Sequence, residues 1–161
     1  MAQYLLGSQC FLDIAKTANL SPERWLAKAG ERGIDGGDIY ISAATPMILS
    51  ATLARETASP GLTVLRENIE ILVRRYVGGL QVVSVTKEIA DRWGTLLDLE
   101  LNYKSRLGTI GSYRFHEKLV LATAIEGLNG RPFVLVERNQ AAHDALRPFG
   151  LKVEDPYQLY P

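Results

Sequence analysis

The sequence predicts an α/β protein built around a mainly parallel sheet. Apolar runs of strand length alternate along the chain with longer segments in which apolar residues recur every three or four positions. The run Phe133 to Val136 is apolar throughout, which is typical of a strand that is covered on both faces. The chain has 161 residues, 47% of them hydrophobic, which is enough for a single domain over residues 1–161 with a full core.

Helix-starting and chain-turning residues delimit the expected elements of the first half. Ser21-Pro22 and Thr45-Pro46 each combine a capping residue with a proline suited to a first helical turn. Two Gly-Gly pairs, at 36–37 and 78–79, are expected to turn or end the chain's regular segments. The expected order is a strand at 4–6, helices over 8–15 and 21–30, a strand at 39–41, and helices over 45–56 and 62–76.

Apolar periodicity continues this alternation in the second half. Thr86 is expected to cap a long helix whose apolar positions reach Tyr103, and Gly127 is expected to end a strongly apolar helix. The expected order is a strand at 80–85, a helix over 86–103, a loop over 105–113, a helix over 117–126, a strand at 133–136, a short helix over 141–146, a strand at 151–153 and a proline-bounded tail.

Composition excludes several classes of function. The 18 basic residues balance 18 acidic residues, so any nucleic-acid role has to come from a local basic patch. The longest apolar stretches are interrupted by Gly, Arg or Glu before they reach the length of a membrane span. Cys10 is the single cysteine, which rules out an internal disulfide and favours a cytoplasmic protein with Cys10 as a small buried residue.

Local phrases add a resemblance to a known family. Tyr-Leu-Leu at 4–6, Tyr-Ile-Ser at 40–42 followed by Thr45, Leu-Val-Leu-Ala-Thr-Ala at 119–124, Arg138-Asn139, and Gly-Leu-Lys-Val-Glu-Asp-Pro-Tyr at 150–157 occur in this order. With them the chain resembles the PIN-domain family, in particular its VapC-type toxin branch, over nearly its whole length. The resemblance implies a three-layer α/β/α sandwich with a parallel sheet of four or five strands. It also implies a ribonuclease that depends on magnesium or manganese.

Such a nuclease needs carboxylates that converge at the carboxyl ends of the strands, because hard divalent ions take oxygen ligands. Counted along the family's phrases, the first acid position falls on Gly7 and the second on Ile48. The third falls on Glu117, which keeps an acid. Glu117 also has an ordinary structural role open to it, because an acid in the first turn of a helix is stabilised by the helix dipole.

The fourth acid position depends on the point from which it is counted. Counting forward from Arg138-Asn139 gives Ala142, and counting back from Gly150 gives Asp144. Positions 7, 48 and 142 are therefore degenerate, and Glu117 and Asp144 are the remaining candidate catalytic acids. Asp13 lies close to Gly7 in sequence but is expected on the surface of the first helix.

These losses predict a catalytically inactive or regulatory module that binds RNA or a partner protein. Two alternatives stay open: an active magnesium- or manganese-dependent endoribonuclease of a toxin–antitoxin system with a reduced acid set, and a purely protein-binding structural subunit. The inactive form needs no cofactor. Expected partners are single-stranded RNA, an antitoxin-like protein or another PIN subunit, and a second copy in a homodimer, with no membrane involved.

Basic side chains supply the candidate nucleic-acid contacts. Arg114, Lys118 and Arg138 are expected at the mouth of the cleft, where they would hold phosphates without cutting the strand. Phe115 lies among them and is a candidate for stacking on unpaired bases. A solvated rim without a ligand, and an aromatic side chain that fills the core, are the alternatives at these positions.

Overall fold

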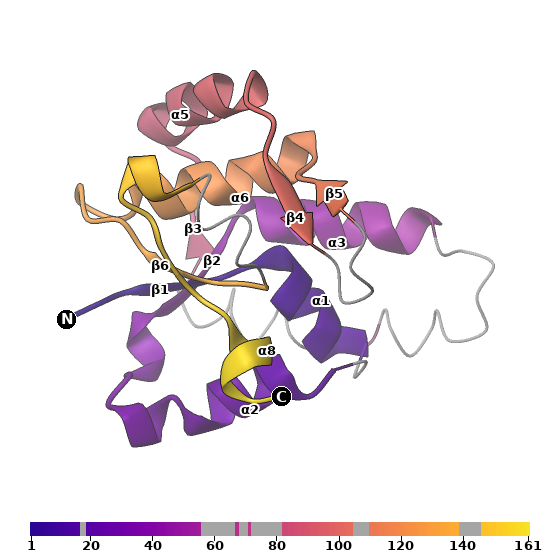
Figure 1. Cartoon of the computed structure of the whole chain (residues 1–161), viewed down its shortest axis with the longest axis vertical. Coiled ribbons are helices and arrows are strands. Elements are labelled where there is room, and N and C mark those ends of the chain that lie inside the picture. Colours follow the sequence, from indigo (N-terminus) through magenta and orange to yellow (C-terminus); the bar gives the residue numbers. More distant parts are fainter. Residues whose placement is uncertain (17–18, 56–66, 68–70, 72–81, 105–109, 139–145) are drawn as a thin grey trace.

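The computed structural model describes the chain except for residues 17–18, 56–66, 68–70, 72–81, 105–109 and 139–145 (Figure 1). The predicted helices over 62–76 and 141–146 fall largely outside the described residues, as does the start of the predicted strand over 80–85. Ala142 and Asp144, two of the predicted site positions, also lie outside them.

A parallel sheet forms the centre of the fold. Its strands are β1 (Tyr4–Leu6), β2 (Ile39–Ser42), β3 (Val82–Val83), β6 (Val134–Val136) and β7 (Lys152–Glu154). The sheet has five strands in the order β3-β2-β1-β6-β7, and each pair of neighbours is parallel. The carboxyl ends of these strands therefore lie along one edge of the sheet, called here the carboxyl edge, where β1, β2 and β6 end side by side.

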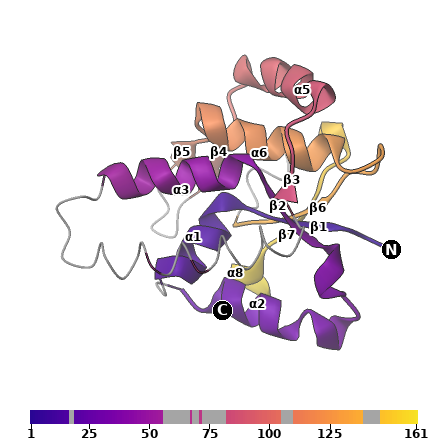
Figure 2. The same cartoon turned by 180° about the vertical axis from the view of Figure 1, so that it is seen from behind.

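Helices cover both faces of this sheet (Figures 1 and 2). One face carries α1 (Ser8–Lys16), α2 (Ser21–Lys28) and α8 (Pro156–Leu159), and the other carries α3 (Ala44–Arg55), α5 (Lys87–Leu97) and α6 (Phe115–Glu126). Leu5 packs into the core under α3, α5 and α6, whereas Leu6 packs with Trp25 of α2 in the opposite core. This alternation confirms the predicted three-layer α/β/α sandwich, and its sheet has five of the predicted four or five strands.

The apolar helix α6 is buried over most of its length. Eight of its residues, from Lys118 to Ile125, are buried. Gly127 ends the helix with a φ of 65°, and a Cβ there would lie 1.7 Å from the carbonyl oxygen of Arg131. Glycine is required at this position because no side chain fits the close turn that leads into β6. None of the described helices is long and apolar enough to cross a lipid bilayer.

The structure corrects the sequence prediction between α5 and α6. The helix predicted to reach Tyr103 ends at Leu97, where the buried amine of Lys118 donates to the carbonyl oxygens of Leu97 and Leu99 at 3.3 and 2.7 Å. These bonds satisfy carbonyls that a helix end leaves without partners. The end of the predicted helix is instead a strand, β4 (Asn102–Lys104), which pairs antiparallel with β5 (Ile110–Ser112) inside the predicted loop.

Short helical turns complete the described chain. Three 3₁₀ turns occupy Gly30–Arg32, Gly36–Asp38 and Arg147–Phe149. Within the predicted proline-bounded tail the chain forms the helical turn α8. The side chain of Asp155 accepts a hydrogen bond from the backbone N–H of Tyr157 at 2.9 Å and so starts this turn. The turn packs against α2 and brings Tyr157 back to α1.

Candidate functional site at the carboxyl edge

Glu137, the residue that follows β6, places a buried carboxylate at the carboxyl edge. One carboxylate oxygen, Oε2, accepts the backbone N–H of Gln9 in the first turn of α1 at 3.1 Å. The other oxygen, Oε1, accepts the backbone N–H of Arg138 at 2.8 Å and the thiol of Cys10 at 3.5 Å. The residue is only 6% exposed. The carboxylate therefore depends on protein donors rather than on water for its hydrogen bonds.

Burial changes the acid–base properties of this cluster. Loss of solvation raises the pKa of Glu137 from 4.5 to about 7, although the amides of Arg138 and Gln9 and the Cys10 thiol act against this rise. Burial and the neighbouring Glu137 charge raise the pKa of Cys10 well above its usual value. The predicted burial of Cys10 is confirmed. A thiol in this setting is a hydrogen-bond donor and not a nucleophile.

Asp13 lies beside Glu137, and its predicted place on the surface is wrong. It is 7% exposed, and its carboxylate accepts hydrogen bonds from the side-chain amide of Gln9 at 2.9 Å and from the Tyr157 hydroxyl. The guanidinium of Arg138 lies 3.5 Å from the same carboxylate, and its central carbon is 4.1 Å from the centre of the Tyr157 ring. Asp13 is buried because α8, which is distant in sequence, packs over it and supplies the Tyr157 hydroxyl as a hydrogen-bond donor.

Gly7, the predicted first acid position, faces the Glu137 carboxylate directly. A Cβ atom on Gly7 would lie 2.0 Å from Oε2 of Glu137, 2.6 Å from its Cδ and 3.0 Å from its Cβ. Gly7 itself is buried, and its N–H donates to the carbonyl of Val136 at 2.8 Å. The room that a side chain at position 7 would need is therefore filled by an acid from the neighbouring strand.

The other two predicted acid positions that the structure describes have structural surroundings. Ile48 is 8% exposed and belongs to the core between the sheet and α6. Glu117 lies in the first turn of α6, where its carboxylate accepts the backbone N–H of Arg114 at 2.6 Å. This contact is the capping role that competes with a metal role for that residue.

The three predicted phosphate contacts have different surroundings. Arg114 is exposed next to Phe115, whose side chain is 60% exposed. Lys118 is only 9% exposed, and its amine is bound to carbonyls at the end of α5. Arg138 lies at the carboxyl edge, where its guanidinium pairs with Asp13 and stacks on Tyr157. Arg114 is thus the member of this set whose charge faces solvent.

The described donors at the carboxyl edge do not fit a hard divalent cation. Among the described residues, no three His, Cys, Asp or Glu side chains are placed to share a metal ion. The carboxylate oxygens of Glu137 already accept hydrogen bonds from two backbone amides and a thiol. Those of Asp13 accept from an amide and a phenol and pair with a guanidinium. A cation would have to displace these donors from two buried carboxylates, which costs the hydrogen bonds that make their burial tolerable.

The sequence prediction missed Glu137 and Tyr157 as members of this cluster. A signal for Glu137 was present, since an acid that directly follows a fully apolar parallel strand lies at the carboxyl edge. Tyr157 carries no comparable signal. Its contact with Asp13 spans 144 positions in sequence and depends on how α8 folds back over α1.

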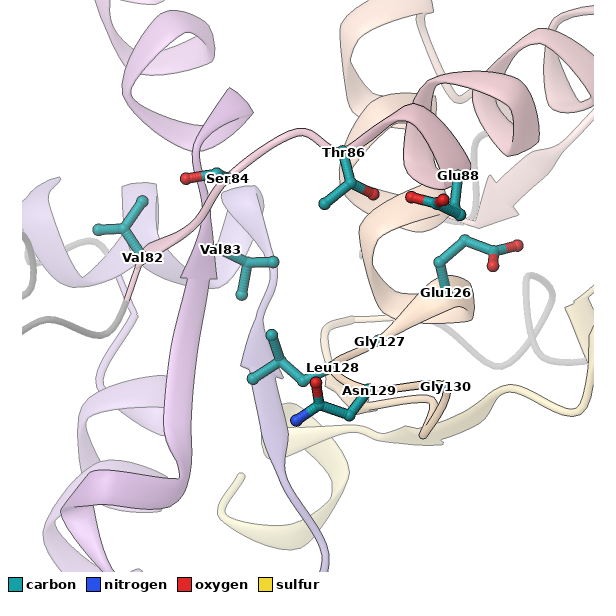
Figure 3. A pocket seen from close by; sticks show the side chains of 10 residues that line it. All are labelled: Val82, Val83, Ser84, Thr86, Glu88, Glu126, Gly127, Leu128, Asn129 and Gly130. Atoms are coloured by element: carbon teal, nitrogen blue, oxygen red, sulfur yellow. The ribbon is translucent and has the colours of Figure 1, made fainter.

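A separate pocket of about 530 Å³ lies between the β3–α5 connection and the end of α6 (Figure 3). The side chains of Glu88 and Glu126 approach one another at one side of it, and Val83 and Leu128 form an apolar part of the wall. Glu126 already pairs with Nε of Arg92 at 2.5 Å. The pocket contains none of the predicted site residues. Its lining consists of Val82, Val83, Ser84, Thr86, Glu88, Glu126, Gly127, Leu128, Asn129 and Gly130.

Comparison with solved structures places this architecture among known folds. A chain of VapBC2 from Rickettsia felis, solved bound to a DNA fragment from its promoter, is similar over 94% of this chain and 97% of its own, with 16% identity and a TM-score of 0.61. A chain of FitAcB from Neisseria gonorrhoeae is similar over 96% of this chain and 99% of its own, with 17% identity and a TM-score of 0.62.

A third structure, FitAB bound to the IR36 DNA fragment, is similar over 96% of both chains, with 16% identity and a TM-score of 0.62. The protein has the fold of these VapBC and FitAB chains. This result agrees with the PIN-like sandwich expected from the sequence. No family model and no curated protein matches the sequence. At such identities the likeness concerns the fold, and function has to be argued from the site.

Proposed function

We propose that this protein is a VapC-like PIN-fold module of the toxin–antitoxin type that binds a partner protein and has lost ribonuclease chemistry. The observation that carries the proposal is the state of Glu137, a buried carboxylate whose oxygens are bound by Gln9, Arg138 and Cys10. A nuclease of this class needs open carboxylates that can hold a hydrated metal ion. Here the carboxyl edge is closed by the protein's own donors.

The surroundings of the basic residues favour a protein partner over RNA. Of the predicted phosphate contacts, Lys118 caps the end of α5 and Arg138 is bound to Asp13, so both charges already have structural partners. Phe115, next to Arg114 in the chain, is by contrast 60% exposed. Leu99 and Leu97, whose carbonyls accept the Lys118 amine, are 39% and 36% exposed. Apolar surface of this kind is suited to a protein interface. The proposed protein partners include a second copy of this chain, which would form a homodimer.

Metal titration is the decisive test of lost ribonuclease chemistry. Calorimetric titration of the folded protein with manganese or magnesium is expected to give no saturable site tighter than about millimolar. The reason is that Glu137 and Asp13, the carboxylates described at the carboxyl edge, already accept hydrogen bonds from protein donors. The same preparation is expected to leave a labelled single-stranded RNA intact in the presence of manganese.

Two variants sharpen the interpretation of this titration. Glu117→Gln tests the acid that the family's pattern retains, and Asp13→Asn tests the acid that the structure places next to Glu137. Micromolar manganese binding that disappears in either variant would contradict the proposal and favour the active endoribonuclease. Binding that both variants leave unchanged would point to acids outside the described residues, including Asp144, and would contradict the proposal equally.

RNA binding without cleavage is the second candidate function, and the exposed pair Arg114 and Phe115 at the start of α6 favours it. If RNA binds there, fluorescence anisotropy should show micromolar or weaker affinity at low salt. Arg114→Ala should then reduce the salt slope by about one, as expected for one lost phosphate contact.

Arg131→Ala is the matched control for the RNA experiment. Arg131 is also exposed, but it precedes β6 and therefore lies at the opposite end of that strand from the carboxyl edge. Lys118 is a poor choice for this experiment, because removing its amine also uncaps α5. No anisotropy change at low ionic strength would exclude the RNA function and leave the partner protein.

A further inference from the structure

Tyr157 holds the C-terminal turn α8 against α1 and the carboxyl edge. Its hydroxyl donates to the carboxylate of Asp13 on α1, and the guanidinium of Arg138 stacks on its ring at 4.1 Å. Burial and the charge of Glu137 raise the pKa of Cys10, and a hydrogen bond from Tyr157 acts against that rise. The Tyr157 side chain therefore covers a cluster that contains an aspartate, a thiol and an arginine.

The end of α8 is less buried than its start. Pro156 is buried and Tyr160 is partly buried, but Leu159 is 49% exposed. The guanidinium of Arg24 on α2 donates to the carbonyl of Pro161 at 2.9 Å in an exposed hydrogen bond. A turn of four residues has little stability of its own, and segments with few buried contacts open more easily than the core.

Charge is unbalanced in the cluster beneath this turn once Glu137 is ionised. The charged and titratable groups around Glu137, among the described residues, are Asp13 and Cys10 of α1, Arg138 of the following segment, Tyr157 of α8, and Glu154 of β7 with its partner Arg32. Arg138 pairs with Asp13, and Arg32 pairs with Glu154. A charge on Glu137 therefore has no cation of its own in the described part of the chain.

We propose that α8 is a strap over the carboxyl edge that stays closed while Glu137 carries a proton and opens more often once Glu137 is charged. Opening brings water to Asp13 and to the Glu137 carboxylate behind it, which relieves the repulsion between the two charges. The strap thus makes exposure of the carboxyl edge depend on pH. This inference concerns a movement of the chain itself and stands whether or not the protein binds a partner.

The direction of this dependence follows from the difference between the closed and open forms. Burial raises the pKa of Glu137 to about 7 in the closed form, and the charge of Asp13 adds to that rise. Water that enters on opening lowers this pKa toward its usual value. The closed form therefore binds the proton more tightly than the open form, so the equilibrium constant for opening increases as the pH rises toward and through 7.

The thiol of Cys10 reports the opening, because it is the single cysteine and is fully buried in the closed form. Its reaction with dithiodipyridine is followed by absorbance, and the rate is divided by that of the urea-unfolded protein at the same pH. Where closing is faster than the reaction, this labelling ratio is the equilibrium constant for opening. It is expected to rise about fivefold to tenfold between about pH 6 and pH 8 in the wild-type protein. Glu137→Gln should remove this rise.

Tyr157→Phe tests whether α8 is the segment that opens. This variant keeps the ring over Arg138 but removes the hydroxyl that donates to Asp13. The labelling ratio is expected to rise by about tenfold at every pH, with its pH dependence kept. Tyr40→Phe is the matched control, because its hydroxyl contacts Gln3 and not α8. It should change the labelling ratio by less than about twofold.

Global unfolding also exposes Cys10, and urea separates the two routes. Opening of α8 exposes little surface, so the labelling ratio should change little with urea below the unfolding transition. Ile89→Val lowers stability in the opposite core and should leave the ratio unchanged. The proposal would be overturned by a ratio that follows global unfolding in urea and in Ile89→Val. A ratio that does not depend on pH, or equal effects of Tyr157→Phe and Tyr40→Phe, would overturn it as well.

Discussion

Glu137→Gln is expected to remove a pH dependence of stability that the wild-type protein shows between about pH 4.5 and pH 7. The pKa of Glu137 is about 7 in the folded protein, against 4.5 without its surroundings. The folded state therefore binds this proton more tightly than the unfolded state does. In that range the free energy of unfolding falls as the pH rises, and above it the loss is complete.

The expected size of this effect is large for one side chain. A difference between about 7 and 4.5 corresponds to roughly 3 kcal/mol, since one pH unit is worth about 1.4 kcal/mol. Urea unfolding at a series of pH values measures it as the difference in free energy of unfolding between wild type and Glu137→Gln. This difference should change by about 2–3 kcal/mol between pH 5 and pH 8.

Glu31→Gln is the control for the substitution itself, because it makes the same chemical change at an exposed glutamate. It should change the free energy of unfolding by less than about 0.5 kcal/mol. A pH-independent difference for Glu137→Gln would mean that the buried carboxylate is stabilised in its charged form, which contradicts the effect of burial argued above.

Ile48→Glu is expected to damage the fold and not to restore a metal site. Position 48 is where the family's pattern calls for an acid, but Ile48 is 8% exposed within the core formed with α6. A carboxylate at position 48 would lose its hydration without gaining hydrogen-bond donors from the protein. Such a change lowers the free energy of unfolding by several kcal/mol. Urea unfolding should show a loss of about 3 kcal/mol or more, and manganese titration should show no gain in affinity.

Met47→Glu provides the matched control one residue away. Met47 is 57% exposed on the same helix, so the same new carboxylate should change stability by less than about 0.5 kcal/mol. If Ile48→Glu proved as stable as Met47→Glu and bound manganese, the carboxyl edge would have kept the room for a metal site.

The order of elements could be predicted because burial follows simple periods in this chain. The fully apolar run that forms β6 and the apolar stretch that forms α6 can be recognised as buried from their composition alone. The end of α5 could not be predicted in this way, since apolar residues continue to Tyr103 at helical spacing. At the observed end an amine from α6 donates to the carbonyls of Leu97 and Leu99, a contact that no local pattern contains.

The candidate site was only partly predictable for a related reason. Counting along family phrases located Gly7 and Ile48 as positions without acids, but it gave no account of what fills their space. Glu137 fills it at one of them, and a packed core fills it at the other. Asp13 was misplaced because an aspartate on a helix is usually solvated, and its burial depends on a distant tyrosine.

The contact between Gly7 and Glu137 also has an evolutionary meaning. Because a Cβ at position 7 would meet the Glu137 side chain, any residue larger than glycine there has to displace that side chain from its hydrogen-bond donors. A smaller residue at position 137 meets no such obstacle while position 7 is glycine. An acid at position 7 is therefore expected to occur together with a smaller residue at position 137, so that the two positions vary as a pair.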